Sequence, residues 1–94
     1  MRIRHIRHKG LRRLYEHDDP KGLPADAVDK LRKMLAFLDA IASEEEVQDV
    51  PTWKAHRLTG NRRGTWSLHV SRNWRLTFEI DRDEMADLNL EDYH

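Results

Sequence analysis

The stretch GTWSLHVSRNWRLTFEI, residues 64–80, alternates apolar and polar side chains on both sides of a central break. Such alternation is typical of strands in a sheet that has one buried and one exposed face. The apolar set is Trp66, Leu68, Val70, Trp74, Leu76, Phe78 and Ile80. The polar set is Thr65, Ser67, His69, Arg75, Thr77 and Glu79. The stretch therefore predicts two antiparallel strands with one polar face.

The register of these two strands follows from the requirement that apolar side chains share a face. Val70 is expected to oppose Trp74, which leaves residues 71–73 as a three-residue loop. Such loops end in a left-handed residue, a conformation that asparagine tolerates. His69 then lies opposite Arg75 on the polar face, since a slip of one residue would bury Arg75.

A third strand is expected after a turn that includes residues 81–83. Its apolar positions are Ala86, Leu88 and Leu90. This strand runs back along its neighbour, so residues 91–94 land beside residues 72–75 at the start of the previous strand. The end of the sequence is thereby placed on a basic, histidine-containing sheet face.

The first half of the chain is mainly helical in pattern. From Pro24 onward, Val28, Leu31, Met34, Leu35, Leu38 and Ile41 form one apolar stripe at helical spacing. The other expected elements are a short strand over residues 2–7, a short helix over 9–17, an acidic connector over 43–50 with a helical turn, and a short strand over 54–58. We therefore expect an α+β fold in which two N-terminal helices pack on one face of a mainly antiparallel, twisted sheet.

The composition limits the class of protein. A chain of 94 residues suits one domain, which we expect to span residues 1–94. There is no cysteine, which excludes disulfides, thiolate metal sites and cysteine nucleophiles. No stretch approaches the roughly 20 apolar residues that span a bilayer, and no apolar signal region follows the basic first residues. We expect a cytoplasmic protein without a membrane partner.

Positive charge is concentrated in two regions although the formal net charge is zero. Residues 2–13 carry six Lys and Arg side chains and no acid, and residues 50–78 do the same. The second region and its loops supply the cations that we expect to contact a polyanion. They are Lys54, Arg57, Arg62, Arg63 and Arg72. One such region is readily explained as a solvated surface, whereas two favour binding of a polyanion.

Side chains suited to RNA cleavage fall on the same predicted face. Cleavage needs a group that activates the 2′-hydroxyl, a proton donor for the leaving oxygen, and a cation for the phosphate. The candidates are His56, His69, Arg75, Asp92, Tyr93 and His94. Each has a structural alternative: His56 as a surface strand residue, His69 as a cross-strand partner of Arg75, Arg75 paired with Glu91, and the final residues as a frayed end. The histidine spacing does not match a metal-ligand pattern, so we expect neither a metal nor a cofactor.

The chain resembles the HigB toxins of the RelE superfamily over essentially its whole length. The matching segments are IRHKGL (6–11), LPA (23–25), KAHRLTG (54–60), GTWSL (64–68), NWRLTF (73–78) and the final DYH (92–94). The resemblance implies a RelE-like fold and a type II toxin–antitoxin system. The toxin would be a ribosome-dependent mRNA endonuclease, an mRNA interferase that inhibits translation. Its partner would be a HigA-type helix-turn-helix antitoxin, with operator DNA bound only through the complex of the two.

The resemblance also implies roles for individual residues. Tyr93 would stack on or orient a base, and Arg75 would hold the scissile phosphate. Proton transfer would be shared among His56, Asp92 and His94, and the sequence leaves open which is base and which is acid. Two positions depart from the family pattern. Some relatives carry lysine at the position of Thr59 and arginine at that of Ser71, and these differences would weaken phosphate binding.

Two other functions are compatible with the same sequence. A non-catalytic nucleic-acid-binding or regulatory module would use the same basic face but would not need the DYH end. A plain partner-binding scaffold would use exposed apolar anchors such as Trp53. The codon preference, the oligomeric state and the antitoxin contact surface do not follow from the sequence.

Overall fold

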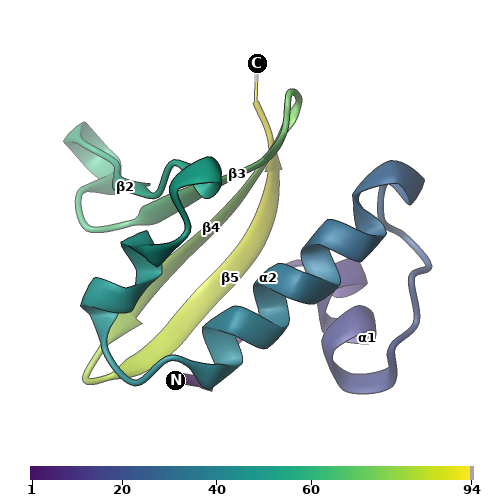
Figure 1. The fold of residues 1–94 in the computed structure, drawn as a ribbon, viewed down its shortest axis with the longest axis horizontal. Coiled ribbons are helices and arrows are strands. Elements are labelled where there is room, and N and C mark those ends of the chain that lie inside the picture. Colours follow the sequence, from purple (N-terminus) through teal and green to yellow (C-terminus); the bar gives the residue numbers. More distant parts are fainter. Residues whose placement is uncertain (94) are drawn as a thin grey trace.

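The computed structural model describes residues 1–93, and these form one five-stranded sheet and two α-helices (Figure 1). The strands are β1 (Arg2–Ile3), β2 (His56–Arg57), β3 (Trp66–Ser71), β4 (Trp74–Asp81) and β5 (Glu84–Asp92). The α-helices are α1 (Lys9–His17) and α2 (Val28–Ala40), and 3-10 helices lie at Ala25–Ala27, Glu44–Asp49, Pro51–Trp53 and Gly60–Arg62. The strand order is β1-β5-β4-β3-β2, antiparallel throughout except for β1 beside β5. The predicted fold class is confirmed.

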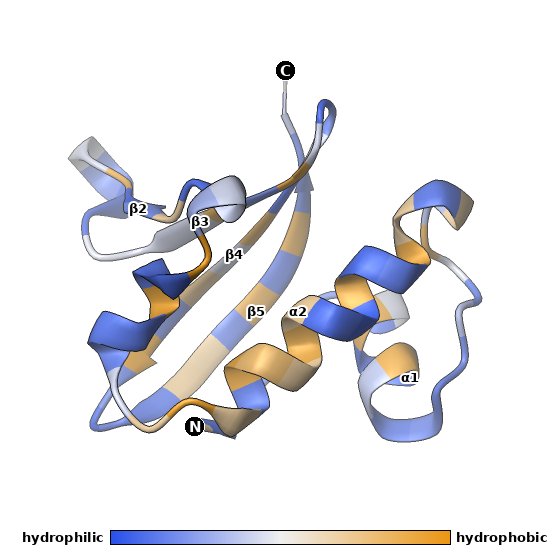
Figure 2. Ribbon diagram, viewed as in Figure 1, coloured by the Kyte–Doolittle hydropathy of each residue, from blue (hydrophilic) through white to orange (hydrophobic). Residues whose placement is uncertain are grey.

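The hydrophobic core lies between α2 and one face of the sheet. All six residues of the predicted helical stripe are buried. They pack in one cluster with strand residues that include Leu68, Leu76, Phe78 and Leu88. Figure 2 shows the alternation of hydrophobic and hydrophilic residues along β5, as expected for a strand with two unlike faces. The opposite, polar face of β2–β5 is thereby left for side chains that carry chemistry.

The β3–β4 connection differs from the prediction. Ser71 pairs with Trp74, so the loop contains only Arg72 and Asn73. Asn73 does not have the positive φ that a three-residue loop would require. His69 still pairs with Arg75 because the register shifts between His69 and Ser71 and accommodates the extra residue. The predicted loop was wrong, whereas the predicted polar pair was right.

The β4–β5 pairing contains a second irregularity, which corrects the predicted face of Ala86. The register shifts between Thr77 and Glu79, and Asp87 adopts a left-handed φ of 53°. As a result Met85, and not Ala86, joins Leu88 in the core cluster. A prediction from strict alternation fails beyond a bulge, because one extra residue moves every following side chain of that strand to the opposite face of the sheet.

Three of the other predicted elements, the first two short strands and the long helix, are shorter than expected. β1 ends at Ile3, and Ile6 contributes only an isolated bridge to Leu88. β2 contains only His56 and Arg57. The short helix begins and ends where the sequence places it, whereas the long helix is preceded by a 3-10 turn and begins at Val28 rather than at Pro24.

Helix α1 depends on a glycine in its first turn. A Cβ at Gly10 would lie 2.9 Å from the carbonyl oxygen of Gly22, 2.9 Å from His8 Cε1 and 3.0 Å from Leu23 Cδ2. The missing side chain therefore lets the loop before α2 pack directly on α1.

We predict that Gly10→Ala destabilises the protein by about 1–3 kcal/mol, because overpacking here outweighs the higher helix propensity of alanine. Urea unfolding followed by circular dichroism measures the change. Arg12→Ala, on the exposed side of the same helix, is the control and should alter the free energy of unfolding by no more than roughly 0.5 kcal/mol. Equal or greater stability of Gly10→Ala would show that the loop over residues 22–23 moves aside without cost.

A histidine caps the start of α1. His8 Nδ1 accepts a hydrogen bond from the backbone N–H of Leu11 at 3.3 Å. Only the ring without a proton on Nδ1 can accept this bond. Burial lowers the pKa of His8 from its ordinary 6.5, which favours the accepting form at neutral pH.

This cap should make stability depend on pH. Since the pKa of His8 is lower in the folded protein than in the unfolded chain, its contribution is complete above pH 6.5 and is lost as the pH falls through the lowered value. His8→Asn keeps a capping oxygen without titrating. Between neutral and mildly acidic pH, the wild type should lose up to about 1 kcal/mol more stability than the variant. Parallel pH profiles of the two proteins would contradict the assignment.

Candidate active site

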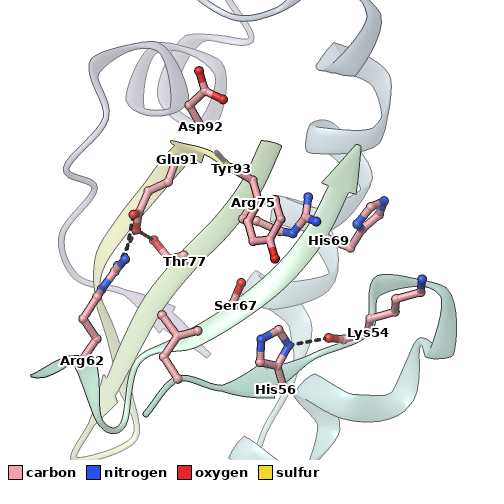
Figure 3. Close-up of a pocket in the computed structure, with 11 residues that line it drawn as sticks. Lys54, His56, Arg62, Ser67, His69, Arg75, Thr77, Glu91, Asp92 and Tyr93 are labelled. Carbon is pink, nitrogen blue, oxygen red and sulfur yellow. Dashed lines mark hydrogen bonds and ion pairs between the residues drawn. The ribbon is translucent and has the colours of Figure 1, made fainter. Parts of the chain in front are cut away.

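A hollow of about 290 Å³ lies on the polar face of the sheet (Figure 3). Side chains from β2, β3, β4 and β5 and from the connections around β2 line it. The lining residues are Lys54, His56, Leu58, Arg62, Ser67, His69, Arg75, Thr77, Glu91, Asp92 and Tyr93. Positions separated by up to 39 residues in sequence thus share one surface, because the antiparallel strands return the end of β5 to the start of β4.

Arg75 and Tyr93 form the best-defined contact in this hollow. The Arg75 guanidinium lies 4.0 Å from the centroid of the Tyr93 ring, within the range of a cation–π interaction. Arg75 Nη1 donates to the backbone carbonyls of Ser71 at 2.7 Å and Trp74 at 3.0 Å. The Tyr93 N–H donates to the carbonyl of Asn73 at 2.7 Å. The side chain of Arg75 and the backbone of Tyr93 are therefore held against the β3–β4 turn.

His56 enters the hollow from the edge strand β2. Its Nδ1 lies 3.0 Å from the carbonyl oxygen of Lys54. A carbonyl oxygen can only accept, so Nδ1 carries the hydrogen of this bond. In the neutral ring the lone pair is then on Nε2, the atom that can take up a proton. The left-handed backbone of Lys54, with φ 49°, bends the chain immediately before this contact.

Glu91 is a carboxylate on the floor of the hollow, and it is paired with Arg62. Arg62 Nη1 donates to Glu91 Oε1 at 2.8 Å, and Nη2 donates to Oε2. The hydroxyl of Thr77 also donates to Oε2. Hydrogen bonds from Arg62 and Thr77 lower the pKa of Glu91 despite its partial burial. The alternative in which Arg75 pairs with Glu91 is therefore not what the structure shows.

His69 lies beside Arg75, as the register predicts. Burial lowers its pKa from the ordinary 6.5, and the nearby cations Arg75, Lys30 and Lys54 lower it further. The ring is therefore mainly neutral at neutral pH.

The other predicted site residues are not all gathered in the hollow. Arg57 lies 5.1 Å from the centroid of the Trp66 ring and pairs with Glu44. Arg63 lines a neighbouring hollow, and Arg72 lines another. Asp92 is at the rim, with its carboxylate directed away from Arg75 and Tyr93 (Figure 3). His94 lies outside the described residues.

Ser67, Thr77 and Glu91 were not predicted as site residues, although each lines the hollow. The sequence could have indicated Ser67 and Thr77, because strand alternation places them on the same face as His69 and Arg75. What the alternation could not supply was the pairing of Glu91 with Arg62, which comes from a separate loop.

No group of three or more His, Cys, Asp or Glu side chains is arranged to hold a metal ion within residues 1–93. None of the helices in that range is long and apolar enough to cross a membrane.

Comparison with known proteins supports the fold and the family. The family model of the RelE-like toxin of the type II toxin–antitoxin system HigB matches residues 4–94. The chain belongs to the HigB-like toxin family. Endoribonuclease HigB of Proteus vulgaris is 39% identical over 92 residues, which is 98% of this chain and 99% of that protein.

Solved structures of this fold include YafQ from Escherichia coli. The crystal structure from strain BL21(DE3) has a TM-score of 0.58 at 14% identity and covers 98% of this chain and 93% of YafQ. A histidine-to-glutamine mutant of YafQ gives a TM-score of 0.55 at 15% identity with the same coverage. These likenesses show that the HigB-like chain shares the YafQ fold.

The Arg62–Glu91 pair should stabilise the loop that precedes β3. In a double-mutant cycle of Arg62→Ala and Glu91→Gln, we predict a coupling free energy of about 1 kcal/mol, which decreases with added salt. The Arg2–Glu84 pair is the control, since its arginine side chain is 76% exposed, and its coupling should be smaller. Equal couplings in the two cycles would mean that the bidentate geometry adds nothing to stability.

Proposed function

We propose that this chain is an endoribonuclease that cuts mRNA on the ribosome and so inhibits translation. The observation that carries the proposal is the convergence of His56, Arg75 and Tyr93 on one hollow of the sheet. Membership of the HigB-like toxin family and the 39% identity to a protein named Endoribonuclease HigB support it.

The proposed reaction is attack of a 2′-hydroxyl on the adjacent phosphate. A new bond forms from the 2′-oxygen to phosphorus, the bond from phosphorus to the 5′-oxygen breaks, and the products are a 2′,3′-cyclic phosphate and a 5′-hydroxyl. We assign His56 Nε2 as the base that takes the 2′-hydroxyl proton, since Nδ1 is bonded to the carbonyl of Lys54. A neutral imidazole is suited to this step near physiological pH.

Arg75 is assigned to the charge that develops on the phosphate. Its Nη1 is held by the carbonyls of Ser71 and Trp74, so we assign Nη2 and Nε as donors to the phosphate oxygens. Tyr93, 62% exposed and stacked on the Arg75 guanidinium, would orient the adjacent base. The stack fixes the spacing between base and phosphate.

With His56 assigned as the base, Asp92 and His94 remain as candidates for the proton donor to the leaving oxygen. The Asp92 carboxylate is directed away from Arg75 in Figure 3, which favours His94. Lys54 and Arg62 line the hollow and would contact the RNA backbone, together with Arg63 and Arg72 at its margins. We assign Arg57 and Arg62 weaker contributions, because they are paired with Glu44 and Glu91 respectively.

The ribosome is proposed to hold the codon in its decoding site. Orientation of the substrate supplies a large part of such a barrier, so a small site without a metal could suffice, and free RNA would be a poor substrate. The family supports an antitoxin partner, which we propose to be of the HigA type and to bring the toxin to operator DNA. The proposed location of the reaction is the cytoplasm.

The test is induction of the wild type and of Arg75→Ala, His56→Gln and a form without His94, with mapping of 5′ ends in cellular mRNA. The wild type should arrest growth and produce in-frame cuts. Each variant should cleave about 10²-fold or more slowly, as expected for loss of a phosphate donor or a proton-transfer group.

Arg12→Ala is the matched control, because it removes an exposed arginine on α1, and it should remain toxic. A second arm compares purified toxin on translated and on free mRNA. Normal growth and intact mRNA with abundant folded wild type would reject the enzyme and favour a non-catalytic RNA-binding module.

A further inference from the structure

A second hollow shares part of its lining with the first. Its volume is about 540 Å³. It is lined by His69, Arg72, Asn73, Arg75 and Tyr93. His69, Arg75 and Tyr93 line both hollows, and Figure 3 shows the Tyr93 ring and Arg75 side by side with His69 beyond them.

The charge of the second hollow differs from that of the first. None of the described residues that line it carries a carboxylate, whereas Glu91 and Asp92 line the first hollow. Arg72 is exposed on the two-residue β3–β4 loop, so its guanidinium is accessible to a ligand. Burial lowers the pKa of His69, and the neighbouring cation Arg75, which also lines this hollow, lowers it further.

The backbone around this hollow is held in place. Asn73 accepts the hydrogen bond from the Tyr93 N–H, and Ser71 accepts one from Arg75. The loop that carries Arg72 is therefore hydrogen-bonded at its two sides to the backbone of Tyr93 and to the side chain of Arg75. A positively charged hollow with an aromatic wall is suited to a nucleotide phosphate.

We propose that the second hollow binds the neighbouring phosphate of the RNA strand, with Arg72 and His69 as its ligands. This rests on the proposed function, in which the scissile phosphate lies at Arg75 and a base lies against Tyr93. Each nucleotide in a strand is flanked by two phosphates. A base on Tyr93 therefore places one phosphate in the first hollow and the next phosphate beside Arg72 and His69. The contribution of Arg72 would offset the absence of a cation at Ser71.

The first experiment follows the ring signals of His69 by NMR as the pH is varied. The probe is a single-stranded RNA trinucleotide with 2′-O-methyl groups, which cannot undergo 2′-hydroxyl attack. Bound phosphate favours the protonated ring, so the trinucleotide should raise the pKa of His69. A matched trinucleotide with an uncharged methylphosphonate backbone should not, and the His17 signals on α1 should respond to neither probe.

The second experiment measures affinity for the same trinucleotide as a function of salt. Arg72→Ala should weaken binding about five- to tenfold and reduce the slope of log K against log salt by roughly 0.7, the value for one phosphate contact in a single strand. His69→Gln should weaken binding while retaining the native unfolding transition. Arg12→Ala and His17→Gln, both exposed on α1, are the matched controls and should bind as the wild type does.

The proposal is overturned if His69 does not respond to the charged trinucleotide, or if the salt slope of Arg72→Ala equals that of the wild type. These readouts involve no cleavage. A wild type that binds in this way but does not cut translated mRNA would reject the proposed function and leave the phosphate site standing. A wild type that cuts translated mRNA, but whose His69 does not respond to the trinucleotide, would support the proposed function and reject the phosphate site.

Discussion

The register between β4 and β5 is the constraint on which the candidate site depends. In the backbone pairing of the two strands Trp74 lies opposite Asp92 and Arg75 opposite Glu91, and the Tyr93 N–H continues the pattern to the carbonyl of Asn73. A slip of one residue would turn Glu91 away from the hollow and bring Leu90 onto the polar face. The register shift between Thr77 and Glu79 does not disturb this arrangement, because it lies nearer to the β4–β5 turn than to the paired ends that carry the site.

Three arginines on or beside the sheet are held in two different ways. Arg62 is paired with Glu91 and Arg57 with Glu44, so carboxylates offset much of their charge. Arg75 is instead held by two backbone carbonyls and by the Tyr93 ring. Carbonyl dipoles and an aromatic face orient a guanidinium without neutralising it. The charge of Arg75 therefore remains available to a ligand, and a count of basic residues along the sequence does not distinguish these environments.

The alternation in the sequence predicts the faces of the strands and the return of the C-terminal strand, because a half-buried sheet imposes a period of two residues. It fails at the two register shifts, beside Val70 and Asp87, because a bulge depends on local backbone geometry rather than on side-chain polarity. Within the site, the pair His69–Arg75 follows from the same alternation. The contacts Arg62–Glu91 and Arg57–Glu44 involve loops whose course no periodicity describes, so sequence reasoning could name the arginines but not their partners.

The two outermost strands, β1 and β2, are each only two residues long. An edge strand presents unpaired N–H and C=O groups, and a long, flat edge is a template on which another chain can add a strand. The short β1 and β2 offer little of this template, and the chain beyond them turns away into helices and loops. Neither outer strand is therefore long enough to serve as such a template by itself, while the broad face between them remains open to ligands.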